Sequence, residues 1–251
     1  MEIRTFGVGS RMEECRRLIA EREESFPFRH LFILPIPSTR DKKTITGTDV
    51  DLEELCSLVG GEDAVAGYGI PENIKEELAM KGALIYDGAE DEELLRRNAE
   101  VTARGALGYI LTNTNRDVSD MRIGIVGYGR IGSCLLRYLL FLGAEVSVYT
   151  TRESVAKELC ESGVDATSAS FDLERLDVLV NTAPARLFSD KHARSFMEGG
   201  RIIDLASGKI FPDAEGLVKL SSVPEKAYPI TAGKIYAEHI AKYFSTEGGL
   251  C

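Results

Sequence analysis

The sequence predicts an α/β fold made of two lobes, each with a parallel sheet covered by helices on both faces. Short β-rich runs alternate with amphipathic helical stretches along the chain, which is the pattern of parallel strands joined by helical crossovers. A long helical stretch at residues 91–111 leads from the first lobe into the second. The length of 251 residues suffices for one large α/β domain or two small ones.

The first half alternates between strands and helices less regularly than the second. Residues 30–36 are almost entirely apolar, so we expect a buried strand there. The predicted strands are residues 3–8, 30–36, 64–67 and 83–86, and the predicted helices are residues 11–22, 51–58, 72–81 and 91–111.

The second half repeats the alternation more clearly. Residues 177–181 form a solid apolar strand, whereas the strand signal at 165–167 is weak. Thr231 precedes the last helical stretch and has a side chain suited to an N-cap. The predicted strands are residues 121–126, 145–150, 165–167, 177–181, 201–205 and 226–229, and the predicted helices are residues 130–142, 154–162 and 231–244.

Composition excludes several classes of function. Acidic side chains outnumber basic ones by 40 to 30 without a basic stripe, so we do not expect nucleic-acid binding. No apolar run approaches the roughly 18–20 residues that span a bilayer, and the N-terminus lacks a signal-peptide pattern, so no membrane association is expected. The cysteines are odd in number and form no C-x-x-C pair, which favours the reducing cytoplasm and argues against a metal site or a disulfide framework.

A glycine-rich run at residues 127–132, G-Y-G-R-I-G, matches the pattern G-x-G-x-x-G between a predicted strand and a predicted helix. Gly127 would permit the tight turn, Gly129 would let the backbone approach a pyrophosphate, and Gly132 would let helix and strand pack closely. The alternative is a structural turn that binds nothing. The candidate cofactor residues of this run are Gly127, Gly129, Arg130, Ile131 and Gly132.

The end of the next strand indicates which nucleotide the lobe prefers. A site for NAD usually places a carboxylate there to bind the ribose hydroxyls, but this chain has Thr150, Thr151 and Arg152, followed by Ser154. Hydroxyls and a guanidinium would bind a 2′-phosphate. We therefore predict NADP(H), with NAD(H) as the alternative, because Arg152 beside Glu153 could simply start a helix in solvent.

The carboxyl ends of the other strands give the candidate substrate residues, since ligands of open α/β sheets bind there. Asn181, Thr182 and Ala183 follow the most apolar strand and should border the nicotinamide ribose. The remaining loops offer hydroxyls and cations but few acids, which suits a small anionic substrate such as a carboxylate. The candidate substrate-binding residues, any of which could instead be a surface charge or a turn residue, are Ser38, Thr39, Arg40, Ser207, Lys209, Thr231 and Lys234.

The sequence does not identify a catalytic residue. None of the three histidines, at positions 30, 192 and 239, begins an obvious carboxylate–histidine relay in the sequence. We assign surface or packing roles to all three and leave the general acid or base unknown.

Several short stretches, spread over most of residues 30–245, occur in the same order along the chain as in a known family. The more specific ones are Asp-Leu-Ala-Ser at 204–207 and Thr-Ala-Gly at 231–233. The stretches are residues 34–37, 66–67, 73–81, 98–113, 124–132, 142–144, 180–184, 203–207 and 229–233. On these residues the chain resembles the family of the A subunit of dipicolinate synthase, two-lobed NADP-dependent oxidoreductases of bacteria.

The resemblance implies oxidation of dihydrodipicolinate to dipicolinate with NADP⁺ as hydride acceptor, partnership with a flavoprotein-like B subunit, and a role in spore formation. It also implies two Rossmann-like lobes, with the last helix crossing back to the first. On this basis residues 1–97 with the helix 232–251 form the substrate lobe, and residues 98–231 form the NAD(P)-binding domain.

The chain departs from the family pattern in three places. The connection at residues 23–29 is short, whereas the family carries roughly another strand there. Lys209 stands where the family tends to have Arg, and Arg104 stands where an acid is expected. Two alternatives therefore stay open: another small-carboxylate dehydrogenase resembling the D-2-hydroxy-acid enzymes, or a non-catalytic NADP(H)-binding or sensing protein. A homodimer suits this fold.

Overall fold

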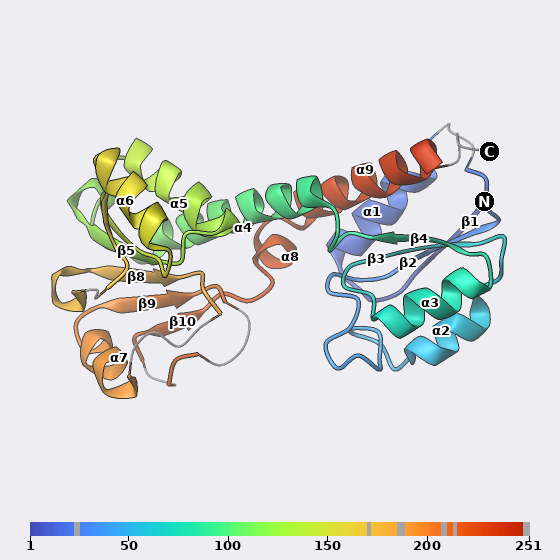
Figure 1. The fold of residues 1–251 in the computed structure, drawn as a ribbon, viewed down its shortest axis with the longest axis horizontal. Helices are drawn as coiled ribbons and strands as arrows, with labels where there is room; N and C mark the ends of the chain where they lie inside the picture. The colour runs from blue at the N-terminus through green and yellow to red at the C-terminus, as the bar shows by residue number, and fades with distance from the viewer. Residues whose placement is uncertain (23–25, 170–171, 185–188, 207–209, 213–214, 248–251) are drawn as a thin grey trace. The chain divides into compact units, whose positions relative to one another are not determined.

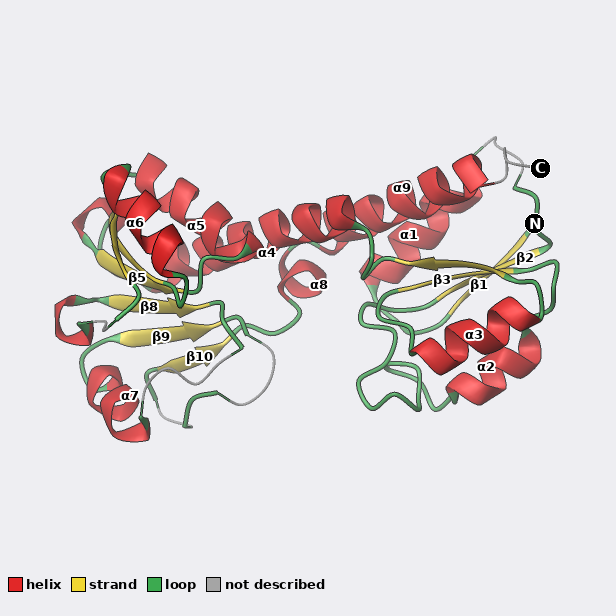
Figure 2. Ribbon diagram, viewed as in Figure 1, coloured by secondary structure: helices red, strands yellow, loops and turns green. Residues whose placement is uncertain are grey.

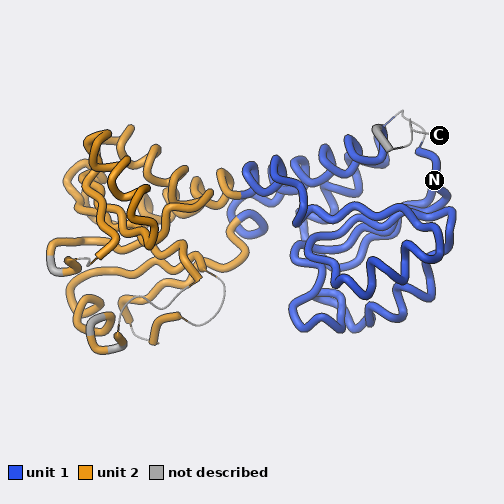
Figure 3. Tube along the Cα trace, viewed as in Figure 1, with its two compact units in different colours: residues 1–98, 224–251 blue, residues 99–223 orange. Residues whose placement is uncertain are grey.

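The structure, a computed structural model, describes residues 1–22, 26–169, 172–184, 189–206, 210–212 and 215–247 (Figure 1). The chain divides into two compact units (Figure 3): unit 1 comprises Met1–Asn98 and Pro224–Cys251, and unit 2 comprises Ala99–Val223. The helix α4 (Glu92–Asn113) begins in unit 1 and ends in unit 2. In the part of the chain that is described, no helix is both long and apolar enough to cross a membrane.

Unit 1 contains a four-stranded parallel sheet in the order β1-β2-β3-β4. Figure 2 shows α1 and α9 on one face of this sheet and α2 and α3 on the other. The bounds are β1 (Glu2–Thr5), α1 (Ser10–Ala20), β2 (His30–Ile33), α2 (Leu52–Leu58), β3 (Ala64–Gly67), α3 (Glu72–Met80), β4 (Leu84–Asp87) and α9 (Pro229–Glu247).

The first crossover of unit 1 is unusual. The connections β1–β2, β2–β3 and β3–β4 all step across the sheet in the same direction, but α1 lies on the opposite face from α2 and α3. The β1–α1–β2 connection therefore has the opposite hand to the two that follow, whereas about 98% of such crossovers are right-handed. A right-handed path through α1 would lead to a strand on the far side of β1, a position that no described strand occupies.

The core of unit 1 has one layer on each face of the sheet. Phe32 and Val65 point toward α2 and α3, where they pack in a cluster that includes Leu55 and Ile74. On the other face α9 packs against α1, and its Tyr236 is fully buried. The last helix of the chain thus completes the first lobe, as predicted.

Unit 2 contains a six-stranded parallel sheet in the order β10-β9-β8-β5-β6-β7. This is the doubly wound order of Rossmann sheets, and the strand order reverses between β5 and β8. The bounds are η1 (Val118–Asp120), β5 (Arg122–Val126), α5 (Arg130–Phe141), β6 (Glu145–Tyr149), α6 (Glu153–Glu161), β7 (Asp165–Thr167), η2 (Leu173–Arg175), β8 (Val178–Asn181), α7 (Asp190–Met197), β9 (Arg201–Asp204) and β10 (Leu217–Lys219).

The structure confirms the α/β prediction with parallel sheets but corrects its last elements. The strand predicted at 226–229 is wrong: those residues lie in and after the helix α8 (Val223–Ala227), and the last strand is β10. Pro224 explains the difference, because a proline suits the first turn of a helix and cannot donate in a sheet. Thr231 is not an N-cap, since α9 already begins at Pro229.

Candidate functional site

The glycine run lies between β5 and α5, at the point where the strand order of unit 2 reverses. Gly127 has a φ of +95°, which L side chains rarely adopt, and its N–H donates to Tyr149 O at 2.8 Å. A Cβ on Gly132 would stand 2.1 Å from Gly127 O. Glycine is therefore required at both positions for the turn to pack against its own helix.

Gly129 differs from its neighbours because the space beside it is open. A Cβ placed there would meet no atom within 4 Å, so packing within the protein does not demand glycine at this position. Gly129 precedes α5, and its carbonyl accepts the bond from Ser133 N–H at 3.0 Å. The first N–H groups of α5 thus point out of the loop, which is the arrangement that binds phosphate in dinucleotide sites. The residues here fit a nicotinamide dinucleotide.

Hydrogen bonds connect the end of β8 directly to this loop. The Thr182 hydroxyl donates to Val126 O at 3.0 Å and to Gly127 O at 3.1 Å, and its N–H bonds to Val126 O at 2.8 Å. A Cβ on Gly127 would come within 3.2 Å of the Ala183 side chain. The structure thus brings Thr182 and Ala183 together with the glycine run.

Asn181 has a role that its sequence position did not indicate. Its side chain is fully buried, donates to Asp204 Oδ1 at 2.8 Å and to Ala183 O at 3.1 Å, and so connects the ends of β8 and β9. Contact between Asn181 and the nicotinamide ribose stays a prediction.

The end of β6 brings Arg152 to the glycine run. Arg152 is exposed at the N-cap of α6, and its Nη2 donates to Tyr128 O. Thr150 is buried, and its hydroxyl accepts from Arg152 N–H at 3.4 Å. Thr151 and Ser154 are exposed beside them. A guanidinium held here can receive an anionic group on a nucleotide bound along the loop.

The candidate substrate residues of unit 1 after β2 largely hold their own loop together. Ser38 is fully buried, and its hydroxyl accepts from Tyr68 N–H at 2.7 Å. The Thr39 hydroxyl donates to Asp41 Oδ1 at 3.0 Å, and hydrogen bonds led by that from the Thr44 hydroxyl hold the pKa of Asp41 well below its usual range. Arg40 is exposed. Of these three residues, only Arg40 has a side chain directed to solvent.

The other candidate substrate residues divide between α9 and an undescribed loop. Thr231 and Lys234 are exposed in the first turns of α9, and Lys234 lies 3.9 Å from Glu238. Ser207 and Lys209 lie outside the described residues.

Arg11, in the first turn of α1, is a buried cation that the sequence reasoning missed. Its guanidinium donates to Asn98 Oδ1 at 3.3 Å and lies over the Tyr236 ring at 5.9 Å, while its Nε has no partner. No described carboxylate lies within ion-pair distance of it. Buried charges are ordinarily paired, so Arg11 is a candidate for binding an anion. The run G-V-G-S before it, between strand and helix, is a signal that could have drawn attention to it.

A second missed feature is a carboxylate–histidine pair in unit 1. His239 is buried in α9, and its Nδ1 lies 2.7 Å from Asp91 Oδ2, which also accepts from the Tyr86 hydroxyl at 2.9 Å. Burial alone would raise the pKa of Asp91, but hydrogen bonds from Leu94 N–H, His239 and Tyr86 outweigh it and hold that pKa below its usual value. The partners lie 148 positions apart in the chain, so no local pattern could reveal them.

Comparisons with known proteins agree with this geometry. Residues 93–221 match the model of the D-isomer specific 2-hydroxyacid dehydrogenase, NAD binding domain. The A subunit of dipicolinate synthase from Bacillus subtilis is 25% identical over 181 residues, which cover 68% of this chain and 60% of that protein. Erythronate-4-phosphate dehydrogenase of Psychrobacter is 30% identical over 124 residues, covering 47% of this chain and 33% of the relative. The alignments thus span less than two thirds of the length of these relatives.

The solved structure of the A subunit of dipicolinate synthase from Bacillus halodurans superimposes with a TM-score of 0.72 at 18% identity, covering 97% of both chains. The resemblance to this protein is therefore present in sequence, weakly, and in the fold of the whole chain. With a matched domain that covers half of its length and a nucleotide loop of the required geometry, the chain belongs to the D-isomer specific 2-hydroxyacid dehydrogenase family, as defined by its NAD-binding domain.

Proposed function

We propose that the protein is an NADP-dependent oxidoreductase of the same type as the A subunit of dipicolinate synthase, which oxidises dihydrodipicolinate to dipicolinate. The observation that carries the proposal is the glycine loop at the reversal point of unit 2, joined by Arg152, in a chain whose whole fold resembles that enzyme.

The preference for NADP(H) rests on the end of β6. Thr150, Thr151 and Arg152 supply hydroxyls and a cation where NAD enzymes place a carboxylate. Arg152 reaches Tyr128 O and so lies beside the loop that would hold the pyrophosphate. A 2′-phosphate bound by this guanidinium would gain charge-assisted hydrogen bonds that a 2′-hydroxyl does not.

The substrate class follows from the cations of unit 1. Dipicolinate and its dihydro precursor each carry two carboxylates, which need positive partners. We assign one to Arg11, whose buried guanidinium has no ion-pair partner among the described residues, and the other to the exposed Arg40 or Lys234. Ser207 and Lys209 remain further candidates for binding the substrate.

The proposed reaction removes two hydrogens from the ring, one as a hydride and the other as a proton. Oxidised nicotinamide, when bound, supplies the hydride acceptor, and aromatisation of the pyridine ring favours this direction. The chain's own contribution is to hold the dinucleotide at the end of β5 and to hold the carboxylates through its cations. The acceptor of the proton is unassigned, since His239 is buried against Asp91.

The test supplies hydroxy-tetrahydrodipicolinate, which gives dihydrodipicolinate by loss of one water, together with NADP⁺, with and without a flavoprotein-like B subunit. It follows dipicolinate and NADPH together. We expect equal amounts of both products from wild type and neither product from Gly129→Asp. Thermal shifts with NADPH and NADH are recorded on the same sample. Stabilisation by NADPH without product would contradict the substrate assignment and would favour a nucleotide-binding protein without this chemistry.

A second candidate is a dehydrogenase of another small carboxylate of the D-2-hydroxy-acid type, which the family match over residues 93–221 favours. It predicts turnover of a D-2-hydroxy acid with NADP⁺ or NAD⁺ and none of dihydrodipicolinate. A panel of such acids, assayed with both nucleotides on the same preparation, distinguishes the two functions.

A further inference from the structure

The strand β1 has a free edge. It pairs with β2 on one side only, and no described strand lies on the other. Glu2 N–H bonds to Arg29 O at 2.9 Å and Phe6 N–H bonds to Ile33 O at 2.9 Å, so the even-numbered residues direct their backbone groups toward β2. By the alternation of a parallel ladder, the N–H and C=O groups of Ile3 and Thr5 face outward. None of the described residues bonds to them.

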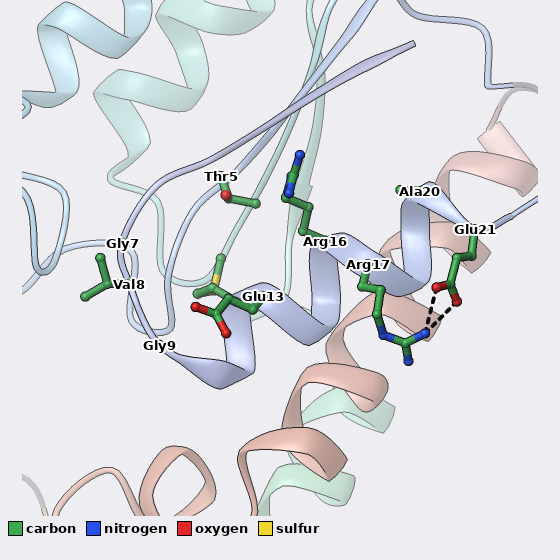
Figure 4. A pocket seen from close by; sticks show the side chains of 10 residues that line it. Thr5, Gly7, Val8, Gly9, Glu13, Arg16, Arg17, Ala20 and Glu21 are labelled. Carbon is green, nitrogen blue, oxygen red and sulfur yellow. Dashed lines mark hydrogen bonds and ion pairs between the residues drawn. The ribbon is translucent and has the colours of Figure 1, made fainter.

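The space beside this edge is open. A cavity of about 470 Å³ is lined by Thr5 and by residues of α1 that include Glu13 and Arg16, as Figure 4 shows. A second cavity of about 480 Å³ is lined by Ile3 together with Arg16 and Ala20. Both cavities border β1 on the side that faces α1. Unpaired edges of this kind are templates for a strand from another chain.

We propose that this edge pairs with β1 of a second copy of the chain, in antiparallel orientation, so that the two four-stranded sheets become one of eight strands. The register that the charges select has Ile3 opposite its own copy. The outward N–H and C=O of Ile3 then bond reciprocally to those of the partner copy, as in a hydrogen-bonded antiparallel pair.

The same register pairs opposite charges. With Ile3 on the two-fold axis, Glu2 of each copy stands opposite Arg4 of the other, and Thr5 stands opposite Met1. Glu2 and Arg4 bond to each other within one chain at 2.9 Å, and Glu2 also lies 3.7 Å from His30 Nε2. Both side chains are exposed, so each can exchange these contacts for one with the partner copy. A register centred on Arg4 would instead place like charges opposite each other, which destabilises a pair of strands. The segment is therefore self-complementary in charge and in hydrogen bonding.

The test is a charge-reversal cycle on the full chain, read by sedimentation velocity over a range of concentrations. Wild type is expected to form dimers. Glu2→Arg alone and Arg4→Glu alone should each raise the dissociation constant roughly tenfold or more, since two attractive pairs become repulsive. The double variant E2R/R4E should restore the dimer, because each arginine again faces a glutamate. Circular dichroism checks that all three variants fold.

Two further measurements locate the contact. Ile3→Pro removes an N–H that points away from β2, so the sheet within one copy keeps its bonds and only the dimer should be lost. The Ile3 and Thr5 amides should exchange more slowly at concentrations where the dimer forms. A protein that stays monomeric at all concentrations, or a dimer that the single charge reversals leave unchanged, would overturn the proposal.

Discussion

The side chain of Asn181, the last residue of β8, donates a hydrogen bond of 2.8 Å to the carboxylate of Asp204, the last residue of β9. The two residues are partners in the ladder between these strands and are both buried. Asp204 also accepts from Ala206 N–H at 3.1 Å and from Lys219 Nζ at 3.2 Å. The Asp204 carboxylate therefore fixes the conformation of the chain at the ends of both β8 and β9, beside the nucleotide loop.

Replacing this carboxylate should be costly. Asp204→Ala leaves the Ala206 N–H and one of the two N–H groups of the buried Asn181 amide without an acceptor, while the other keeps Ala183 O, so we expect the free energy of unfolding to fall by about 2–4 kcal/mol. Lys219→Ala is the comparison, because its side chain is partly exposed and its loss leaves the bonds from Asn181 and Ala206 to Asp204 intact, so we expect a smaller loss. Urea denaturation measures both. Equal losses in the two variants would contradict the central role of Asp204.

Two glycines of the same loop should respond oppositely to substitution. Gly129→Asp places its side chain in open space, so we expect normal thermal stability but nucleotide binding weakened roughly a hundredfold by repulsion of the phosphates. Gly132→Ala drives a Cβ against Gly127 O and should lower the melting temperature. Calorimetric titration with NADPH and thermal denaturation measure the two effects. Full binding by Gly129→Asp would show that the loop does not hold the nucleotide.

The choice between the two nucleotides should depend on Arg152. In Arg152→Gln we expect the affinity for NADPH relative to NADH to fall about tenfold or more, because the charge-assisted bonds to the 2′-phosphate are lost. Lys157→Gln, on the exposed side of the same helix, is the matched control. Fluorescence titrations with both nucleotides provide the ratio. A ratio that Arg152→Gln leaves unchanged would refute the assignment.

The buried Arg11 should matter more for ligand binding than for folding. Arg11→Met gives up one hydrogen bond to Asn98 but also removes a buried charge that lacks an ion-pair partner, so we expect the stability to change by less than about 1 kcal/mol. Dipicolinate binding should weaken tenfold or more. Arg16→Met, on the exposed side of α1, serves as the control. Unchanged dipicolinate affinity in Arg11→Met would remove Arg11 from the site.

The Asp91–His239 pair should make the free energy of unfolding depend on pH in the acid range. The pKa of Asp91 is lower in the folded chain than its usual value, so its ionised form stabilises the fold at pH above about 4, and this stabilisation is lost as the pH falls through the folded pKa. Asp91→Asn should therefore be less stable than wild type at pH 7, and the difference should shrink below about pH 4. Urea midpoints across this range test it. A difference independent of pH would contradict the role of the charge.

The sequence predicted best where the signal was local. The glycine run and the strand before it were recognisable because each of their requirements falls within about a dozen residues. The strand β10 was missed because Leu217–Lys219 is too short to show a period. Ser38 could be named as a loop residue, but its use as the acceptor for Tyr68 N–H depends on a contact across 30 positions.

By itself, the sequence determined the fold class, the two lobes and the nucleotide loop of this protein, because hydrophobic periodicity and glycine chemistry act over short stretches of chain. Only the tertiary structure decided which side chains meet: Asn181 with Asp204, His239 with Asp91, and Arg11 with no ion-pair partner among the described residues. It also decided that β1 is an edge strand with an unusual crossover. The physical reason is that strand order, burial and pairing between distant residues are set by packing the whole unit around one core, which no local pattern records.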